Sequence, residues 1–200
     1  MSIVVVGIDV GGRKKGFHAV ALKEGEFFCK QASTNANALA DWCRSIRAQV
    51  VAVDAPCRWR TLDGRARLAE LAMATEGIRC YYAPTEEKAR SHAFYAWMLS
   101  GQELYSALAI AGCAVIETFP HAVTCALSGK VVSAKDKRSI RRSLLRKLGF
   151  HIAELSNIDE VDAALCAFAA QSFAHEQFKT YGDPIGGFII VPNLSLSHGD

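Results

Sequence analysis

The sequence predicts an α/β fold in which a mixed five-stranded sheet carries helices on both faces. Three observations favour this fold class. Apolar runs typical of buried strands alternate with segments whose apolar residues recur at helical spacing, from about residue 35 onward. Two short apolar segments precede the first helical pattern, between residues 17 and 31. Three apolar runs end in a carboxylate, at Asp9, Asp54 and Glu117.

The first three strands are predicted to form an antiparallel meander. Residues 3–9 are continuously apolar and rich in β-branched side chains, which is typical of a central strand with both faces buried. Residues 17–22 and 26–31 are two shorter segments joined through Gly25, as expected of a hairpin. The meander therefore precedes any parallel strand.

The middle of the chain predicts a crossover to a parallel strand. Residues 35–47 carry apolar side chains at helical spacing, and the apolar run over 50–54 follows them directly. Because a helix connects the two strands, the run over 50–54 is placed parallel to the first strand. A basic loop then leads into a helix over 66–75 and a short strand near 80–82.

The second half of the chain alternates helices and strands. The expected elements are a mostly helical stretch over 86–111 with a break near Gly101, a fifth strand over 113–117, an amphipathic helix over 137–148 and a final long helix over 157–178. The closing stretch from Gly182 onward should add one extended segment and then a frayed tail over about 193–200.

Composition places the chain among water-soluble globular proteins. The 200 residues are 50% hydrophobic and 22% charged, which predicts one domain over residues 1–200. The beginning of the chain has no basic segment before its apolar run, and no stretch approaches the ~18 apolar residues of a membrane span, so we expect a cytoplasmic protein without membrane contact. Seven cysteines without a CxxC pair indicate reduced thiols.

The acids at strand ends are the main functional signal, because an unpaired carboxylate that leaves water costs several kcal/mol or becomes neutral. Asp9 and Asp54 end strands that should lie parallel and adjacent, at the edge where open α/β sheets bind ligands. Asp159 and Asp162 share one face of the last helix. Such oxygen donors suit Mg²⁺ or Mn²⁺, and two ions about 3.5–4 Å apart can promote hydrolysis of a phosphodiester.

Each acid also has an ordinary structural interpretation. Asn157 and Glu160 have the spacing of a helix capping box, which alone would explain the acids of the first turn, Asp159 included. Asp162 is harder to explain in this way, since it lies in the second turn of an apolar run.

The strand-end acids have alternatives of the same kind. Asp9 could cap the GGRKKG turn, and Asp54 could form a turn before Pro56. Glu117 could pair with an arginine. The coincidence of several acids at strand ends favours a metal site over these separate explanations.

The order of the motifs resembles a known family. The chain presents GIDVGG, two further strands, VAVDAP, VIETFPHA, DEVDAALCAFAA and finally GDPIGGFIIVP. This order is similar to that of the domain of unknown function 429 family, predicted nucleases of the RNase H-like fold. The last helix also resembles that of RuvC-type Holliday junction resolvases, whose acids bind two metal ions and which act as dimers.

This resemblance implies a role for each acid. Asp9 corresponds to the bridging metal ligand, Asp54 to the fourth-strand ligand, and Asp159 with Asp162 to the helix pair. The fourth-strand acid of the resolvases is commonly Glu, whereas this chain has the shorter Asp54. Glu117 has no counterpart in the four-acid pattern and enters as a catalytic candidate only through similarity to the uncharacterised family.

Basic residues near these acids are candidates for holding a phosphate backbone. Arg58, Arg60 and Arg65 flank Trp59 in the loop after the Asp54 strand, and His121 follows Glu117 by four residues. A second basic stretch over 130–147 holds eight of the 23 basic residues. A solvated surface is the alternative for both stretches, and a capping or core histidine is the alternative for His121.

The sequence therefore predicts a metal-dependent nuclease that uses Mg²⁺ or Mn²⁺, expected as a two-ion site, and acts on a nucleic acid. Its catalytic residues would be Asp9, Asp54, Glu117 and Asp162; its metal ligands Asp9, Asp54, Asp159 and Asp162; and its substrate-binding residues Arg58, Arg60, Arg65 and His121. A binding module without turnover is the alternative. An actin-like ATP-binding phosphotransferase is disfavoured, because those proteins need two such domains. The sequence leaves the oligomeric state open, with a homodimer as the form that the resolvase resemblance raises.

Overall fold

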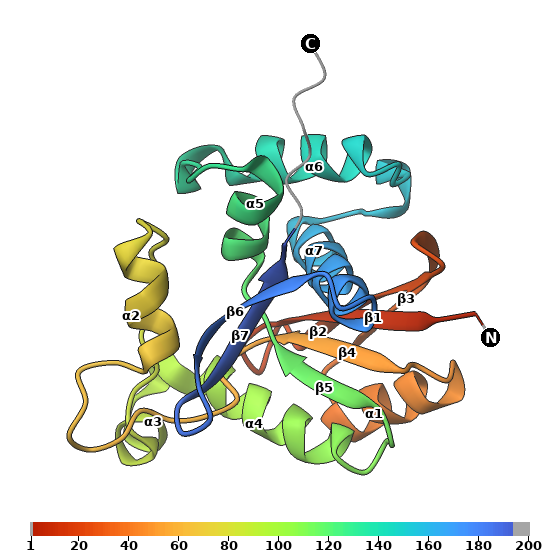
Figure 1. Cartoon of the computed structure of the whole chain (residues 1–200). Helices are drawn as coiled ribbons and strands as arrows, with labels where there is room; N and C mark the ends of the chain where they lie inside the picture. Colours follow the sequence, from red (N-terminus) through yellow and green to blue (C-terminus); the bar gives the residue numbers. More distant parts are fainter. Residues whose placement is uncertain (1, 194–200) are drawn as a thin grey trace.

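A computed structural model describes residues 2–193 and shows a mixed sheet of seven strands rather than the five expected. The strand order is β3-β2-β1-β4-β5-β7-β6 (Figure 1). The strands are β1 (Val4–Val10), β2 (Phe17–Lys23), β3 (Glu26–Ser33), β4 (Val50–Asp54), β5 (Ala114–Glu117), β6 (Phe178–Asp183) and β7 (Gly187–Pro192). The α/β class and the mixed sheet are confirmed, and the strand number is corrected.

The predicted antiparallel meander is present at one edge of this sheet. β1 pairs antiparallel with β2, and β2 pairs antiparallel with β3. On its other side β1 pairs parallel with β4, which in turn pairs parallel with β5. The continuous apolar run of β1 is thus buried on both faces, as its composition predicts.

The two additional strands come from the end of the chain. β6 and β7 form an antiparallel hairpin where the sequence predicted the end of the last helix and a single extended segment. β7 enters the sheet parallel to β5, through the pairing of Glu117 with Ile189. The backbone N–H of Asn193 donates to the carbonyl of Gln177, just before β6, and the rest of the expected frayed tail lies outside the described residues.

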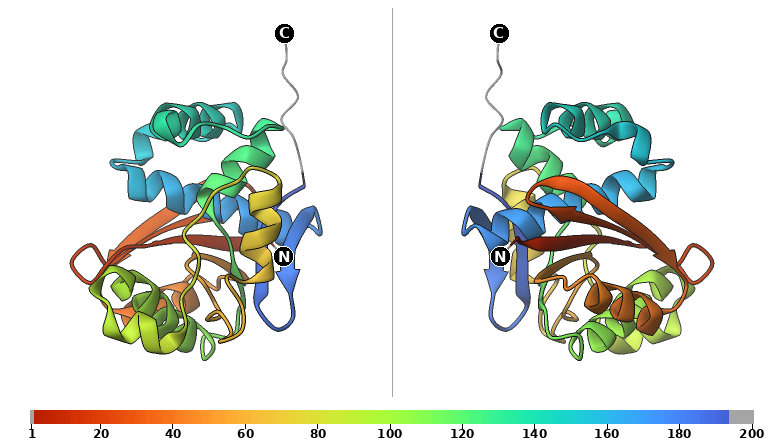
Figure 2. Two further views of the ribbon diagram at one scale, coloured as in Figure 1. Left: turned by 90° about the vertical axis from the view of Figure 1, so that its left-hand side faces the viewer. Right: turned by 90° about the vertical axis from the view of Figure 1, so that its right-hand side faces the viewer.

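Helices cover both faces of the sheet, as expected. Figure 1 shows α7 (Ile158–Ala174), α5 (Pro120–Ser128) and α6 (Lys137–Lys147) on one side, and α1 (Ala36–Ser45) and α4 (Ala96–Leu108) on the other. The side views in Figure 2 show the same division into layers. The remaining helices are α2 (Leu68–Thr75), α3 (Glu86–Ser91) and the short 3₁₀ turns η1 (Ala93–Tyr95), η2 (Ala134–Asp136) and η3 (Ile152–Glu154).

Two local predictions were wrong, and one helix was missed. The helical stretch over 86–111 breaks at His92, which is extended, and not near Gly101. Gly101 instead lies inside α4, where the helix packs closely on the end of β4. A Cβ at this position would be 2.5 Å from the Cβ of Ala55, which explains why the helix has a glycine there. Residues 80–82 form no strand, and α5 was not predicted at all.

Gly7 sets how closely the last helix approaches the sheet. A Cβ at this position would lie 2.0 Å from the backbone nitrogen of Ala167 and 2.1 Å from the carbonyl oxygen of Ala163 in α7. Because Gly7 has no side chain and α7 is rich in alanine, the helix backbone packs directly on β1. This close packing brings the first turns of α7 over the carboxyl end of β1.

No helix among the described residues combines the length and apolar character that crossing a membrane requires.

Candidate active site at the carboxyl ends of β1 and β4

Asp9 and Asp54 lie side by side at the carboxyl ends of two central strands. They occupy the same register of the parallel β1–β4 pair. Along each strand they alternate with Ile8 and Val53, whose side chains fill the core under α1 and α4. Since successive side chains alternate between faces, both carboxylates point to the α7 face of the sheet.

The first turns of α7 add two more acids on the same face. Asn157 caps the helix by accepting the backbone N–H of Glu160 at 2.8 Å, and Glu160 accepts the backbone N–H of Ser156 at 2.7 Å. The predicted N-cap at Asn157 is therefore present, but Glu160 bonds to Ser156, the residue before the cap, and so does not complete the capping box. Asp159 and Asp162 take no part in this cap and lie close enough to Asp9 for their charges to affect it.

Burial and mutual repulsion make this cluster unfavourable for negative charge. Burial, with the negative charges of Asp162 and Asp159, raises the pKa of Asp9 to about 7. Burial and the charges of Asp9 and Asp162 raise the pKa of Asp54 well above its usual value. Burial also raises the pKa of Asp162, although Arg141 opposes the shift. The three acids thus form one electrostatic unit.

Basic side chains that sequence reasoning placed elsewhere neutralise the two helix acids. Arg141 of α6 is buried and donates through Nη1 to Oδ1 of Asp162, although the helical pattern placed it on the solvent-exposed side. Lys15, in the turn between β1 and β2, reaches Asp159 with its Nζ 2.9 Å from Oδ2. The signal in the sequence that pointed to such pairing was Asp162, the acid that opens the otherwise apolar run DAALCAFAA of α7.

His18 is a second residue that the sequence analysis did not consider. It pairs with Asp9 across the β1–β2 ladder, and its Nε2 lies 3.9 Å from Oδ2 of Asp159. Its other ring nitrogen, Nδ1, is buried without a hydrogen-bond partner among the described residues. The alternation of β2 places this ring beside the acids, a relationship that requires knowledge of the strand register.

The four aspartates have the oxygen atoms that a divalent cation prefers, but their positions suit such an ion only in part. Asp9 and Asp54 form no hydrogen bond or ion pair through their side chains within residues 2–193, so their oxygens are available as ligands. Within the same residues, however, no three His, Cys, Asp or Glu side chains converge on a common point. Asp162 is held by Arg141 and Asp159 by Lys15. The arrangement offers two carboxylates for an ion and would gain further ones if those pairs opened.

Glu117 lies in a buried ion-pair network next to Asp54: both residues line one pocket, and burial, helped by the charge of Glu117, raises the pKa of Asp54. Glu117 is the register partner of Val53, so its side chain belongs to the sheet face opposite the Asp9–Asp54 pair. Arg67 donates to both of its carboxylate oxygens, at 2.6 and 2.8 Å, and also to Glu70 at 2.8 Å. The alternative interpretation of Glu117, pairing with an arginine, describes this contact. A catalytic role for Glu117 stays a prediction.

Comparison with known proteins places this chain in a family. Residues 7–185 match the family described as protein of unknown function (DUF429). The chain belongs to the DUF429 family. No curated protein matches it in sequence. Its fold is similar to that of Thermus thermophilus RuvC, with a TM-score of 0.52 and 16% identity over 87% of this chain and 96% of that one.

A second solved structure, T. thermophilus RuvC in complex with Holliday junction substrate, gives a TM-score of 0.52 and 17% identity over 87% of this chain and 96% of that chain. At such identities the likeness shows a shared fold. The DUF429 chain thus has a RuvC-like α/β architecture, and its four aspartates lie on β1, β4 and the last long helix of that architecture.

The predicted substrate-binding residues of the DUF429 chain lie in different surroundings. Arg58 and Arg65 are exposed. The guanidinium of Arg60 donates to backbone carbonyls of its own loop, including that of Thr61 at 3.1 Å. His121 is buried at the start of α5, where burial and the charges of Arg141 and Lys137 lower its pKa. His121 thus lies near Arg141 and Lys137, and its predicted role in substrate binding stays a prediction.

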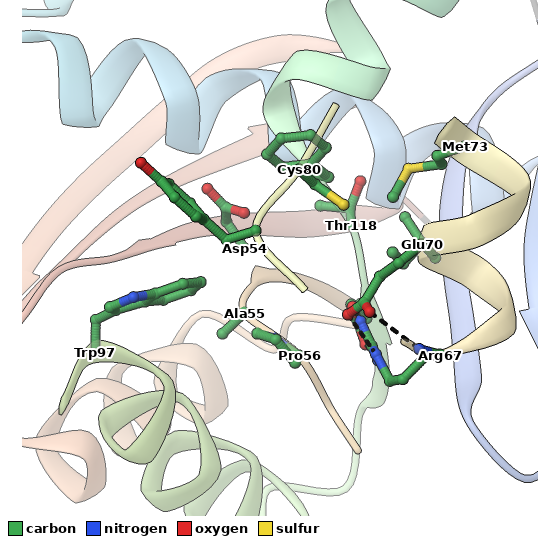
Figure 3. A pocket seen from close by; sticks show the side chains of 13 residues that line it. Asp54, Ala55, Pro56, Arg67, Glu70, Met73, Cys80, Trp97 and Thr118 are labelled. Atoms are coloured by element: carbon green, nitrogen blue, oxygen red, sulfur yellow. Dashed lines mark hydrogen bonds and ion pairs between the residues drawn. The ribbon is translucent and has the colours of Figure 1, made fainter. Parts of the chain in front are cut away.

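A small pocket of about 60 Å³ lies next to Asp54. Figure 3 shows Asp54 and Trp97 on one side of it and the ion-paired Arg67 and Glu70 on the other. Gln102 and Tyr105 of α4 fasten this region by donating to the carbonyls of Pro56 and Ala55, at 2.6 and 2.9 Å, respectively. The segment that follows β4 is therefore firmly positioned beside the acids.

Proposed function

We propose that this protein is a metal-dependent nuclease of RNase H-like type. The observation that carries the proposal is the shared register of Asp9 and Asp54 at the ends of adjacent parallel strands, with Asp162 of α7 close enough to repel both. A cation would stabilise partly buried carboxylates that repel one another in their charged form, and a site with oxygen donors favours Mg²⁺ or Mn²⁺.

In this proposal Asp9 and Asp54 hold the ion, and water and phosphate oxygens of the substrate complete its coordination. Mg²⁺ in proteins is commonly held by one or two carboxylates in this way. The bound ions would activate a water molecule and stabilise the leaving oxygen of a phosphodiester. If Asp162 left Arg141, it would become a further metal ligand, and the released guanidinium could donate to a phosphate of the substrate. In the same way, Asp159 would become a ligand if it left Lys15, and the released ammonium group could contact a phosphate.

The proposed substrate is a nucleic acid. The RuvC-like fold supports this choice, because one of the similar structures is a complex of T. thermophilus RuvC with Holliday junction substrate. Basic side chains near the acids also support it. Arg141 and Lys15 contact the acids directly, and Arg58 and Arg65 lie exposed in the loop after β4.

A nucleic-acid-binding module without turnover is the second candidate. The observation that favours it is that Lys15 and Arg141 already neutralise the two acids of α7. If these ion pairs persist when substrate binds, only two carboxylates remain for metal. The two candidates differ in one measurable property, the requirement for a divalent ion.

The test is a titration of Mg²⁺ and Mn²⁺ into the wild type and the Asp9→Asn variant by calorimetry, with parallel cleavage of single-stranded, duplex, hybrid and junction substrates of DNA and RNA. Asp41→Asn is the matched control, because Asp41 is an exposed aspartate of α1 that pairs with Arg44. We expect Asp9→Asn to lose metal binding and cleavage together. Equal metal affinity in all three proteins would exclude Asp9 as a ligand, and metal-independent binding without cleavage would favour the second candidate.

A further inference from the structure

An aromatic surface lies beside the proposed active site, formed by Tyr81, Phe94, Tyr95 and Trp97. Tyr81 comes from the segment before α3, and the other three come from η1 and the start of α4. The side chain of Tyr81 is 71% exposed and that of Phe94 is 48% exposed. Large aromatic side chains gathered on a surface indicate a binding site more strongly than isolated ones do.

The rings of this aromatic surface support one another. The ring centroids of Tyr81 and Phe94 are 5.4 Å apart, and those of Phe94 and Tyr95 are 5.1 Å apart, both in edge-to-face geometry. The ring of His92 lies 5.8 Å from that of Tyr95 and extends the row. Edge-to-face contacts hold the rings in place, while Tyr81 and Phe94 remain largely exposed.

The aromatic surface continues into the pocket that contains Asp54. Tyr81 and Trp97 line this pocket together with Asp54. In Figure 3 the indole of Trp97 lies next to Asp54 and Ala55. A ligand that rests on the aromatic rings therefore meets an acid of the proposed metal site at the end of the same surface.

Two exposed arginines lie in the segments that border the aromatic surface. Arg79 is exposed two residues before Tyr81, and Arg58 is exposed in the loop after β4. That loop is fixed against the segment carrying Tyr81, since the backbone N–H of Arg60 donates to the carbonyl of Pro84 at 3.1 Å. The ligand that suits both features has flat apolar groups joined by negative charges, which describes a nucleic-acid strand with unpaired bases.

We propose that the aromatic surface stacks the unpaired bases of a DNA or RNA strand and so leads its phosphates to Asp9 and Asp54. The bases of an intact duplex are stacked on each other and cannot reach the rings of Tyr81 and Trp97. The substrate class of the proposed nuclease is therefore a nucleic acid with an unpaired segment, an inference that rests on the proposed function.

The experiment measures binding without turnover. Fluorescence anisotropy in EDTA compares a labelled single-stranded oligonucleotide, as DNA and as RNA, with the blunt duplex of the same sequence. The variants are Tyr81→Ala and Trp97→Ala, with Trp97→Phe as the conservative replacement. Phe28→Ala is the matched control, because Phe28 is 45% exposed on the edge strand β3 at the other side of the sheet. Thermal unfolding followed by circular dichroism verifies that each variant is folded.

We expect the wild type and Phe28→Ala to bind a single strand more tightly than the duplex. Tyr81→Ala and Trp97→Ala should each bind the single strand roughly tenfold more weakly, the loss expected when one stacked base is lost, and Trp97→Phe should recover most of the affinity. The inference is overturned if Tyr81→Ala, whose exposed side chain is not needed for folding, binds as the wild type does. It is also overturned if the wild type binds the duplex equally well or binds neither.

Failure of the proposed nuclease function would give a different result. If the wild type binds single strands through Tyr81 and Trp97 but cleaves nothing with Mg²⁺ or Mn²⁺, the base-stacking role of the aromatic surface is supported and the nuclease function is contradicted. If the wild type cleaves substrates but Tyr81→Ala binds unpaired strands normally, the nuclease function is supported and the base-stacking role is contradicted.

Discussion

Asp9 and Asp54 are register partners on the parallel strands β1 and β4, and both face the last long helix, α7. This relationship places two carboxylates side by side with no basic residue bonded to either of them within residues 2–193. The other two acids of the cluster, Asp159 and Asp162, each have a basic partner. The division into two free and two paired acids leads to the following predictions.

Asp9→Asn should stabilise the metal-free protein at alkaline pH. The folded state raises the pKa of Asp9 to about 7, above the value of about 4 in an unfolded chain, so folding favours the protonated form. Wild-type stability is therefore lost as the pH rises from about 4 through about 7. Urea unfolding in EDTA should give Asp9→Asn a higher free energy of unfolding than the wild type at pH 8, by up to a few kcal/mol, and a smaller advantage at pH 5. An advantage that does not change with pH would contradict the raised pKa.

Gly7→Ala should strongly destabilise the fold. The new Cβ would collide with backbone atoms of α7, which cannot move aside as a flexible side chain could. Overpacking typically costs about 1–3 kcal/mol, and a collision with backbone should reach or exceed the upper end of that range. Gly12→Ala is the control, because a Cβ at Gly12 has no atom within 4 Å. Chemical denaturation of both variants makes the comparison, and similar stabilities would show that α7 does not depend on Gly7.

Arg141→Met should destabilise the protein and strengthen metal binding. Removing one partner of a buried ion pair costs about 3–5 kcal/mol, here because Asp162 remains buried without its cation. The same carboxylate is then free to join Asp9 and Asp54, so calorimetry should show tighter binding of Mn²⁺. Arg138→Met, at an exposed position of the same helix, should change neither quantity. Weaker metal binding in Arg141→Met would mean that Asp162 does not act as a ligand.

Glu117→Gln should affect stability far more than metal binding. Arg67 and Glu117 are both buried, and the amide would leave the guanidinium with a single counter-charge, Glu70. We expect a loss of about 3–5 kcal/mol in the free energy of unfolding. The affinity for Mg²⁺ should stay near that of the wild type, since Arg67 already occupies both carboxylate oxygens of Glu117.

Glu86→Gln provides the surface reference for this experiment. Glu86 forms an exposed ion pair with Arg90 within α3, and such pairs contribute about 0–1 kcal/mol. A large loss of metal affinity in Glu117→Gln, without one in Glu86→Gln, would instead support the catalytic role that the resemblance to its family implies for Glu117.

Much of the site's framework could be predicted from the sequence because it depends on local patterns. The β-branched run ending at Asp9 and the crossover to Asp54 follow from strand composition and from connection rules, and both are present. The N-cap hydrogen bond from Glu160 to Asn157 is likewise a contact between residues three apart. These features need only the spacing of neighbouring residues.

The partners of the acids depend on the tertiary structure. Arg141 and Lys15 are far from Asp162 and Asp159 along the chain. The local sequence around each of them is charged, which is typical of a solvent-exposed surface. A buried position for Arg141 becomes favourable only when α6 packs on α7 and supplies Asp162 as its counter-ion. The hairpin of β6 and β7 was missed for a similar reason, since β7 is stabilised by pairing with β5.

The sequence by itself determined the α/β class, the meander and the acids at the ends of β1 and β4, because apolar periodicity and connection length suffice for these. Only the tertiary structure decided which acids are free, which are paired and that Glu117 pairs with Arg67. The physical reason is that charge pairing depends on distance in space and on burial, and both arise when α6, α7 and the loop after β4 pack around the sheet.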